Sequence, residues 1–151
     1  MRNLLLTMFL LLSSHSAYAC YDESQSGKAN FDNCMAQVKQ GDLGAVYMLG
    51  FLYSTGEGVI QDDKKAVLWY TRAAEYGHPA AQSNLGIMYY QGKGVTQDYK
   101  QAAKWYRKSA EQGYAGAQNN LGVLYRDGKA VTQDYEQAVK WYTKAAEQGD
   151  T

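Results

Sequence analysis

Residues 80–113 read AAQSNLGIMYYQGKGVTQDYKQAAKWYRKSAEQG, and this pattern recurs at a step of 36 residues. Aligning 77–112 with 113–148 without a gap gives 23 identical positions out of 36. The recurring landmarks include Gly41, Gly77, Gly113 and Gly149; Trp69, Trp105 and Trp141; and Leu49-Gly50, Leu85-Gly86 and Leu121-Gly122. A fixed period of this length indicates a repeat architecture. The sequence therefore predicts three units, 41–76, 77–112 and 113–148.

Each unit has the pattern of two helices. In the second unit, Ala81, Leu85 and Tyr89 recur every four residues, as on one face of a helix. Glycines at 92 and 94 end that helix, and Asp98 is a suitable N-cap for the next one. A glycine inside a helix, such as Gly86, makes the helix less stable than alanine would. Its recurrence in every unit therefore suggests that a neighbouring helix packs close against it. The predicted helices are 43–54, 63–76, 79–91, 99–112, 115–127 and 135–148, preceded by a capping helix at 28–40 within the segment 20–40.

The N-terminus has the three-part layout of a secretory signal peptide over residues 1–19. A basic start with Arg2 precedes the apolar run Leu4 to Leu12, and Ala17-Tyr18-Ala19 forms a small-x-small cleavage site. Nine apolar residues are too few to cross a bilayer, which needs about 20. We therefore expect an exported protein, periplasmic or secreted and without a transmembrane segment. A short N-terminal membrane anchor is the other interpretation.

The chain has two cysteines, Cys20 and Cys34. In an oxidising compartment a Cys20–Cys34 disulfide is the default expectation, and it would close a loop of about 15 residues. Two alternatives remain open: free thiols, or an outer-membrane lipoprotein in which Cys20 carries the lipid. Ala17 and Tyr18 match a lipoprotein processing signal poorly.

The composition and motifs argue against several function classes. Lys and Arg total 15 and balance 15 Asp and Glu, whereas a nucleic-acid binder needs a basic face. No serine has a lysine three residues later, as a serine β-lactamase requires. After the signal peptide His78 is the single histidine, so no zinc ligand set is evident. We expect no enzyme activity, no cofactor, no metal site and no nucleic-acid partner.

The pattern in 80–113 resembles the Sel-1-like repeat, a relative of the tetratricopeptide repeat, and the resemblance covers 41–149. Departures are few: Ala130 replaces the second loop glycine, and Asp63 and Ser109 replace an aromatic residue and an alanine. The resemblance implies an all-α fold, a right-handed α/α superhelix whose first helices line a concave face. Such proteins mostly act as adaptors or scaffolds, and exported bacterial members include host-interaction and envelope factors. Some cysteine-rich relatives have been described as β-lactamase-like or penicillin-binding, an alternative that the missing motifs disfavour.

Residues that vary at a repeat position are not dictated by the fold, so they can serve binding. By similarity to the tetratricopeptide pattern, varying positions on the first helices face the concave groove. The predicted protein-binding residues are Tyr47, Phe51, Ser83, Ile87, Tyr90, Asn119, Val123 and Arg126. Aromatic residues and arginine are favoured at binding hot spots. Packing of Phe51 and Ile87 between the repeats is the competing interpretation.

These observations predict an exported repeat protein that binds a protein or peptide partner in its concave groove, as an adaptor, scaffold or host or envelope factor. An alternative role is a periplasmic immunity or inhibitor protein against an envelope-targeted toxin. No further helix follows the third unit in this sequence, so the outer face of 135–148 is expected to be partly exposed. Such an exposed end allows weak end-to-end self-association.

Overall fold

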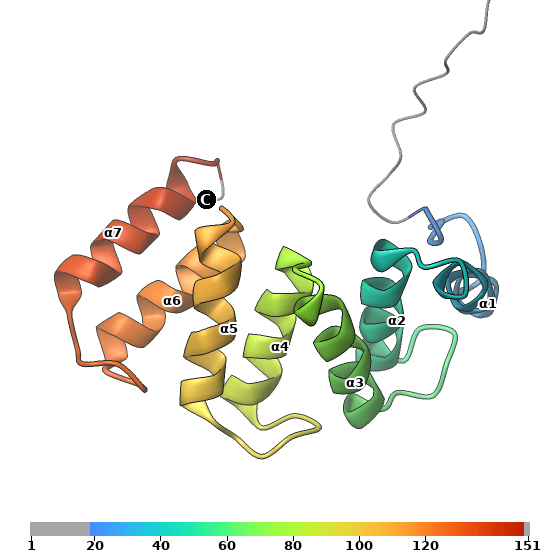
Figure 1. Cartoon of the computed structure of the whole chain (residues 1–151), viewed down its shortest axis with the longest axis horizontal. Coiled ribbons are helices and arrows are strands. Elements are labelled where there is room, and N and C mark those ends of the chain that lie inside the picture. The colour runs from blue at the N-terminus through green and yellow to red at the C-terminus, as the bar shows by residue number, and fades with distance from the viewer. Residues whose placement is uncertain (1–18, 150–151) are drawn as a thin grey trace, which may run out of the picture.

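The computed structural model describes residues 19–149, which form seven α-helices and no strands (Figure 1). The helices are α1 (Gly27–Val38), α2 (Leu43–Thr55), α3 (Asp63–Glu75), α4 (Pro79–Gln91), α5 (Tyr99–Glu111), α6 (Ala115–Asp127) and α7 (Tyr135–Ala146). Every predicted helix is present, with its ends within two residues of the expected ones. The predicted signal peptide lies outside the described residues except for Ala19.

The helices follow one another as a row of antiparallel pairs, from α1 at one end to α7 at the other (Figure 1). Within each unit the two helices pack together, as α2 with α3, α4 with α5, and α6 with α7. Consecutive units join through α3 against α4 and through α5 against α6. This nearest-neighbour packing confirms the predicted all-α solenoid.

Capping residues explain why the second helices begin where they do. The side chains of Asp62, Asp98 and Asp134 accept hydrogen bonds from backbone N–H groups in the first turns of α3, α5 and α7. The N–H of Lys65 in particular holds the pKa of the Asp62 carboxyl below its usual range. Each such cap gives a hydrogen-bond partner to N–H groups that have none within the helix. The prediction that Asp98 is an N-cap is confirmed, and the equivalent aspartates of the other units do the same.

The predicted close packing at the Leu-Gly pairs is also confirmed. The glycine of each Leu-Gly pair faces a tyrosine ring of the second helix in the same unit, with no room for a side chain between them. A Cβ atom on Gly50 would lie 2.6 Å from the Tyr70 ring, and one on Gly122 would lie 2.7 Å from the Tyr142 ring. The preceding leucines, Leu49, Leu85 and Leu121, are fully buried.

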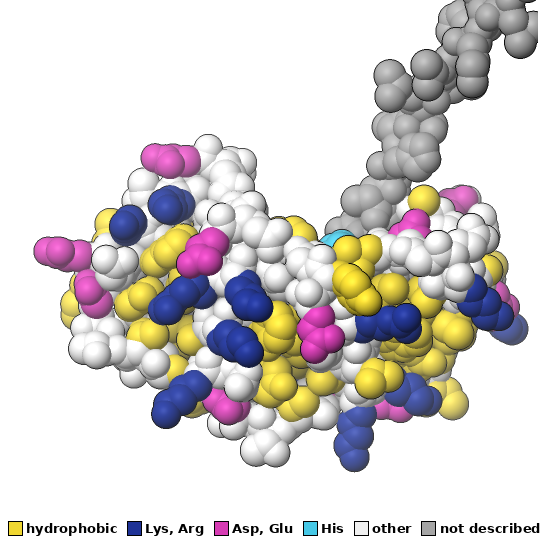
Figure 2. All heavy atoms as spheres, viewed as in Figure 1, with side chains coloured by type: hydrophobic (Ala, Val, Ile, Leu, Met, Phe, Trp, Pro, Cys, Tyr) yellow, Lys and Arg dark blue, Asp and Glu magenta, His cyan; other side chains and the backbone are white. Residues whose placement is uncertain are grey.

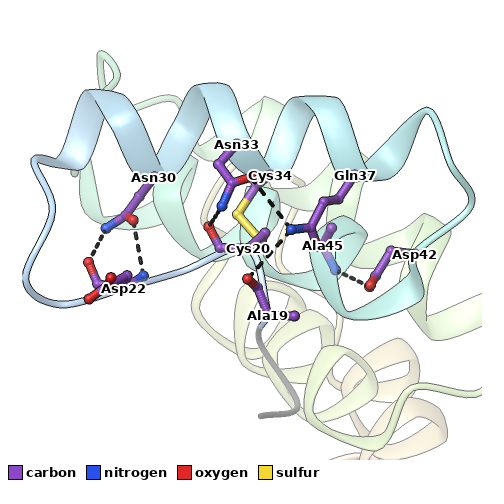
Figure 3. Close-up of a disulfide and its surroundings, with 9 residues drawn as sticks. All are labelled: Ala19, Cys20, Asp22, Asn30, Asn33, Cys34, Gln37, Asp42 and Ala45. Carbon is purple, nitrogen blue, oxygen red and sulfur yellow. Dashed lines mark hydrogen bonds between the residues drawn. A yellow bond between two sulfur atoms is a disulfide. The ribbon is translucent and has the colours of Figure 1, made fainter. Parts of the chain in front are cut away.

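A disulfide joins Cys20 to Cys34, as predicted, and fastens the N-terminal segment to α1 (Figure 3). Hydrogen bonds support it: the Asn33 side chain donates to the Cys20 carbonyl at 2.8 Å. Asn30, fully buried, both donates to the Asp22 carbonyl and accepts from the Asp22 N–H at 3.0 Å. In this structure the disulfide uses both sulfur atoms, so neither cysteine is a free thiol.

Helix α1 occupies the place of a second helix, as the sequence predicted for a degenerate cap. The evidence is a contact that repeats at the 36-residue step. A Cβ atom on Gly94 would collide with the backbone of Asp63 at the start of α3, and one on Gly58 would collide with Gly27 at the start of α1. The loop of the first unit therefore rests on α1 in the same way as the loop of the second unit rests on α3.

Candidate functional site

The first helices α2, α4 and α6 form one groove. Helices α2 and α4 are in direct contact, and a hollow of about 250 Å³ lies between them. A second hollow of about 220 Å³ lies between α4 and α6. Ile87 and Gln91 border both hollows, so the two hollows lie next to each other, and together they make up the groove.

Four of the eight residues predicted for protein binding line this groove. Phe51 borders the first hollow, Tyr90 and Val123 border the second, and Ile87 borders both. All four side chains are half-buried, so each keeps part of its apolar surface in reach of a ligand.

Two of the predicted residues, Tyr47 and Ser83, are buried and are not available on the groove surface. Tyr47 is 9% exposed; its ring stacks on His78 with centroids 4.7 Å apart and tilts against Tyr70 at 5.9 Å. Ser83, the equivalent residue of the next unit, is 2% exposed. This position packs between helices, so the structure corrects its assignment to the binding surface.

The last two predicted residues lie on α6. Asn119 is half-buried and borders neither hollow. Arg126 is exposed and donates through Nε to the Asp127 carboxylate at 2.7 Å. That charged hydrogen bond lowers the pKa of Asp127 and raises the pKa of Arg126. The pair leaves a charged rim at the end of the groove that lies nearest the C-terminus.

Sequence reasoning missed the polar residues of the groove. Asn84 and Asn120, one repeat apart, border the first and second hollow respectively. Tyr70 and Tyr106, also one repeat apart, border the same two hollows, although they are only 2% and 3% exposed and belong to the core. Burial raises the pKa of both phenols, so each hydroxyl stays neutral. The 36-residue spacing of the two asparagines, which the two tyrosines share, is the sequence signal that could have placed these residues in the groove.

The first helices contribute little charge to the groove. Helices α2 and α4 contain no charged residue at all, and α6 contains only Arg126 and Asp127. Asp63 and Lys93 border the first hollow from the neighbouring helix and loop. Neutral amides and hydroxyls beside apolar side chains can hydrogen-bond an uncharged chain and bury its apolar side chains, whereas they would leave a buried charge unpaired.

Lys129 holds Tyr90 in place from the following loop. Its ammonium group donates to the Tyr90 hydroxyl at 2.7 Å and lies 4.8 Å and 5.2 Å from the ring centres of Tyr90 and Tyr99. The hydrogen bond from Lys129 to Tyr90 raises the pKa of the lysine, so it remains charged. Tyr90 is thus a fixed wall of the groove, and a fixed side chain loses little entropy when a ligand binds.

The comparisons with known proteins agree with this architecture. The family model of the Sel1 repeat matches residues 44–78, 79–114 and 115–150. The chain therefore belongs to the Sel1 repeat family, whose members typically mediate protein–protein interaction and act as scaffolds without catalysis. A search of curated proteins found no match. Within residues 19–149 there is no helix with the length and hydropathy needed to cross a membrane.

Three solved structures show the same fold. A protective antigen present in uropathogenic Escherichia coli strains, with an SLR fold, is 43% identical over 88% of this chain, with a TM-score of 0.80. A Sel1 repeat protein from Oxalobacter formigenes is 38% identical over 82% of this chain, with a TM-score of 0.77. The matches cover 28% and 49% of those two chains. Helicobacter pylori cysteine rich protein B is 24% identical over 81% of this chain and 90% of its own, with a TM-score of 0.63.

Proposed function

We propose that this protein binds an extended, uncharged segment of a partner protein in the groove formed by α2, α4 and α6. Ile87 carries the proposal, because it is the apolar side chain that borders both hollows. Apolar side chains of the ligand would enter the hollows beside Phe51, Tyr90 and Val123. The amides of Asn84 and Asn120 would hydrogen-bond its backbone, which needs donors and acceptors once it leaves water. The mechanism is recognition by a rigid surface, without chemistry.

We further propose that the protein works outside the cytoplasm. The N-terminal leader pattern and the Cys20–Cys34 disulfide support export, because disulfides persist in oxidising compartments. The E. coli relative is described as a protective antigen, which supports a role at the cell envelope or in contact with a host. Within that compartment the chain would serve as an adaptor or scaffold.

A peptide library provides the test. Peptides selected on the purified protein should be rich in apolar residues and poor in charge over the segment that binds. The variant Ile87→Glu places a carboxylate in both hollows, and we expect it to weaken binding by at least about 30-fold, as for an interface hot spot. Dissociation constants would be measured by fluorescence anisotropy with the selected peptides.

A matched control separates the groove from the rest of the surface. Val139→Glu makes the same kind of change on α7, where Val139 is 62% exposed and borders neither hollow. Its affinity for the selected peptides should equal that of the wild type, and thermal melts should show that both variants fold. Peptides that bind Ile87→Glu as tightly as the wild type would exclude the groove as the binding site.

A further inference from the structure

The outer face of α3 differs from the outer faces of the other second helices. Leu68, in the middle of α3, is 66% exposed. The equivalent residues one and two repeats later are Lys104 and Lys140, which suit an exposed helix surface. The fold therefore does not require an apolar residue at this position. Leu68 forms an apolar patch with the half-buried Val67 and Trp69, and such patches mark interaction surfaces.

Leu68 lies on a stripe that runs the length of α3. Lys64, Leu68, Thr71 and Glu75 follow the i, i+4, i+7, i+11 spacing, which places them on one side of the helix. All four border a shallow hollow of about 440 Å³, together with Val67, Trp69 and Arg72. Figure 2 shows hydrophobic side chains among basic and acidic ones over this helix. Along the stripe, Lys64 is basic, Leu68 apolar and Glu75 acidic, and the basic Arg72 lies beside the stripe.

This order of charges is complementary to itself. When two copies of α3 pack antiparallel about a two-fold axis between Trp69 and Tyr70, Lys64 of each copy faces Glu75 of the other. Leu68 of each copy then faces Thr71 of the other, in the middle of the contact. Lys64 and Glu75 make no ion pair within 4.0 Å among residues 19–149, so both charges are available for this pairing.

We infer that two copies of this chain form a two-fold symmetric dimer through the outer faces of α3. Opposite charges then meet at both ends of the contact, and the two leucines are buried together between them. This surface is separate from the proposed peptide groove, so either proposal can fail without the other.

The other second helices cannot pair in the same way. The corresponding stripe on α5 contains Lys104 and Arg107, which would face each other in an antiparallel pair. On α7 the same arrangement would place Glu136 opposite Glu147. Like charges in contact disfavour both pairings, so the repeat itself selects α3.

The dimer should be weak. A single pair of helices buries an area at the low end of specific interfaces, so we expect a dissociation constant on the order of 10 to 100 µM. Sedimentation velocity of the full chain from about 5 to 500 µM covers this range. The expected result is a shift from monomer to dimer as concentration rises, and a monomer throughout would overturn the proposal.

Leu68→Lys is the first variant, because the equivalent residues show that the fold accepts lysine there. It should raise the dissociation constant at least tenfold. Val139→Lys is its matched control, since Val139 is 62% exposed on the outer face of α7 and also has an apolar side chain. Dimerisation should survive this change. Loss of the dimer in Val139→Lys but not in Leu68→Lys would place self-association at the α7 end and overturn the proposal.

Charge reversal tests the antiparallel register. Lys64→Glu places an acidic residue in the first turn of α3 and Glu75→Lys a basic one in the last, changes that the helix dipole favours, so folding is retained. Each single reversal should weaken the dimer at least tenfold, because like charges then face each other. The double variant restores opposite charges and should return to within about threefold of the wild type. A double variant as weak as the singles would overturn the proposed register.

Discussion

A Cβ atom on Gly86 would lie 2.6 Å from Cδ1 of the Tyr106 ring, so a glycine in α4 makes room for a tyrosine in α5. Tyr106 is 3% exposed, and its ring fills the space that a side chain at 86 would occupy. The same pairing recurs in the units on either side, so it holds the two helices of each unit together.

Gly86→Ala is therefore expected to destabilise the protein. Alanine favours the helix by up to about 1 kcal/mol over glycine, yet forcing a methyl group into a packed core costs about 1 to 3 kcal/mol. The buried ring cannot move without displacing its neighbours, so we expect a net loss of about 1 to 2 kcal/mol, measured by urea unfolding.

Gly116→Ala is the control for this prediction. There the new Cβ would lie 3.2 Å from Cε1 of Tyr114, a looser contact than at Gly86, and the Tyr114 side chain is 37% exposed. Alanine at 116 should leave stability unchanged or raise it slightly. Equal effects of the two substitutions would show that close packing at Gly86 is not what requires the glycine.

The arrangement of helices could be predicted because local signals agree with the repeat. Asp98 and Gly92 set the ends of helices through their own backbone and side-chain chemistry, and such signals can be read from one sequence. The 36-residue period then supplied the architecture. No long-range information was needed to place these elements.

The surface of the groove could be predicted only in part. Tyr47, Ser83 and Asn119 differ among the units, and this variation suggested a solvent-facing position. Tyr47 instead stacks on His78, and the residue equivalent to His78 in the next unit is Tyr114. The large Tyr47 is thus combined with His78, and the small Ser83 of the next unit is combined with the larger Tyr114. Such opposite changes in size are typical of two positions that pack against each other across an interface. The repeat period shows on which side of its helix a residue lies. It does not show which side chain of the neighbouring helix that residue contacts.

Ala130→Gly is expected to stabilise the protein. Ala130 has φ +60°, and the equivalent residues of the other units are glycines at φ +72° and +68°. A left-handed conformation costs an L-residue about 1 to 2 kcal/mol, while glycine adds entropy to the unfolded chain. The expected net gain is about 0.5 to 1 kcal/mol, measured by urea unfolding.

The reverse change provides the comparison. Gly94→Ala puts a Cβ in the same conformation and against the backbone of Asp63, so it should destabilise the protein. If Ala130→Gly lowers the stability, the contacts of the alanine side chain stabilise the protein by more than the left-handed backbone conformation destabilises it.

The disulfide is expected to stabilise the N-terminal cap more than the rest of the solenoid. Cys20 and Cys34 are separated by 14 residues, and closing a loop of that size contributes roughly 3 kcal/mol in the chain-entropy model. In a Cys20→Ser/Cys34→Ser variant, hydrogen exchange should quicken first in the amides of α1. Amides of α4 serve as the internal reference, because α4 lies two units from the change.

A reducing agent checks that the effect comes from the bond itself. Reductant should quicken α1 exchange in the wild type and change nothing in the double serine variant. Uniform quickening across α1 and α4 would contradict the prediction, because it would mean that the cap and the repeats unfold as one unit.

His78 is expected to make stability depend on pH in the mildly acidic range. Its Nδ1 accepts a hydrogen bond from the Ala81 N–H at 3.3 Å and so caps α4. Burial lowers the pKa of this imidazole below 6.5. The unfolded chain therefore binds the proton first as pH falls, and stability that is present above about pH 6.5 is lost below it. A protonated Nδ1 cannot accept the hydrogen bond, and a positive charge at a helix N-terminus is unfavourable.

Asparagine at this position separates capping from titration. His78→Asn keeps a side-chain acceptor for α4 at every pH, so its stability should change little between about pH 7.5 and 5, while that of the wild type falls. Urea midpoints of both proteins at the two pH values give the comparison. Asp62 does not interfere, because its lowered carboxyl pKa moves its own contribution to more acidic solutions. The same loss of stability in both proteins over this range would assign the pH dependence to a group other than His78.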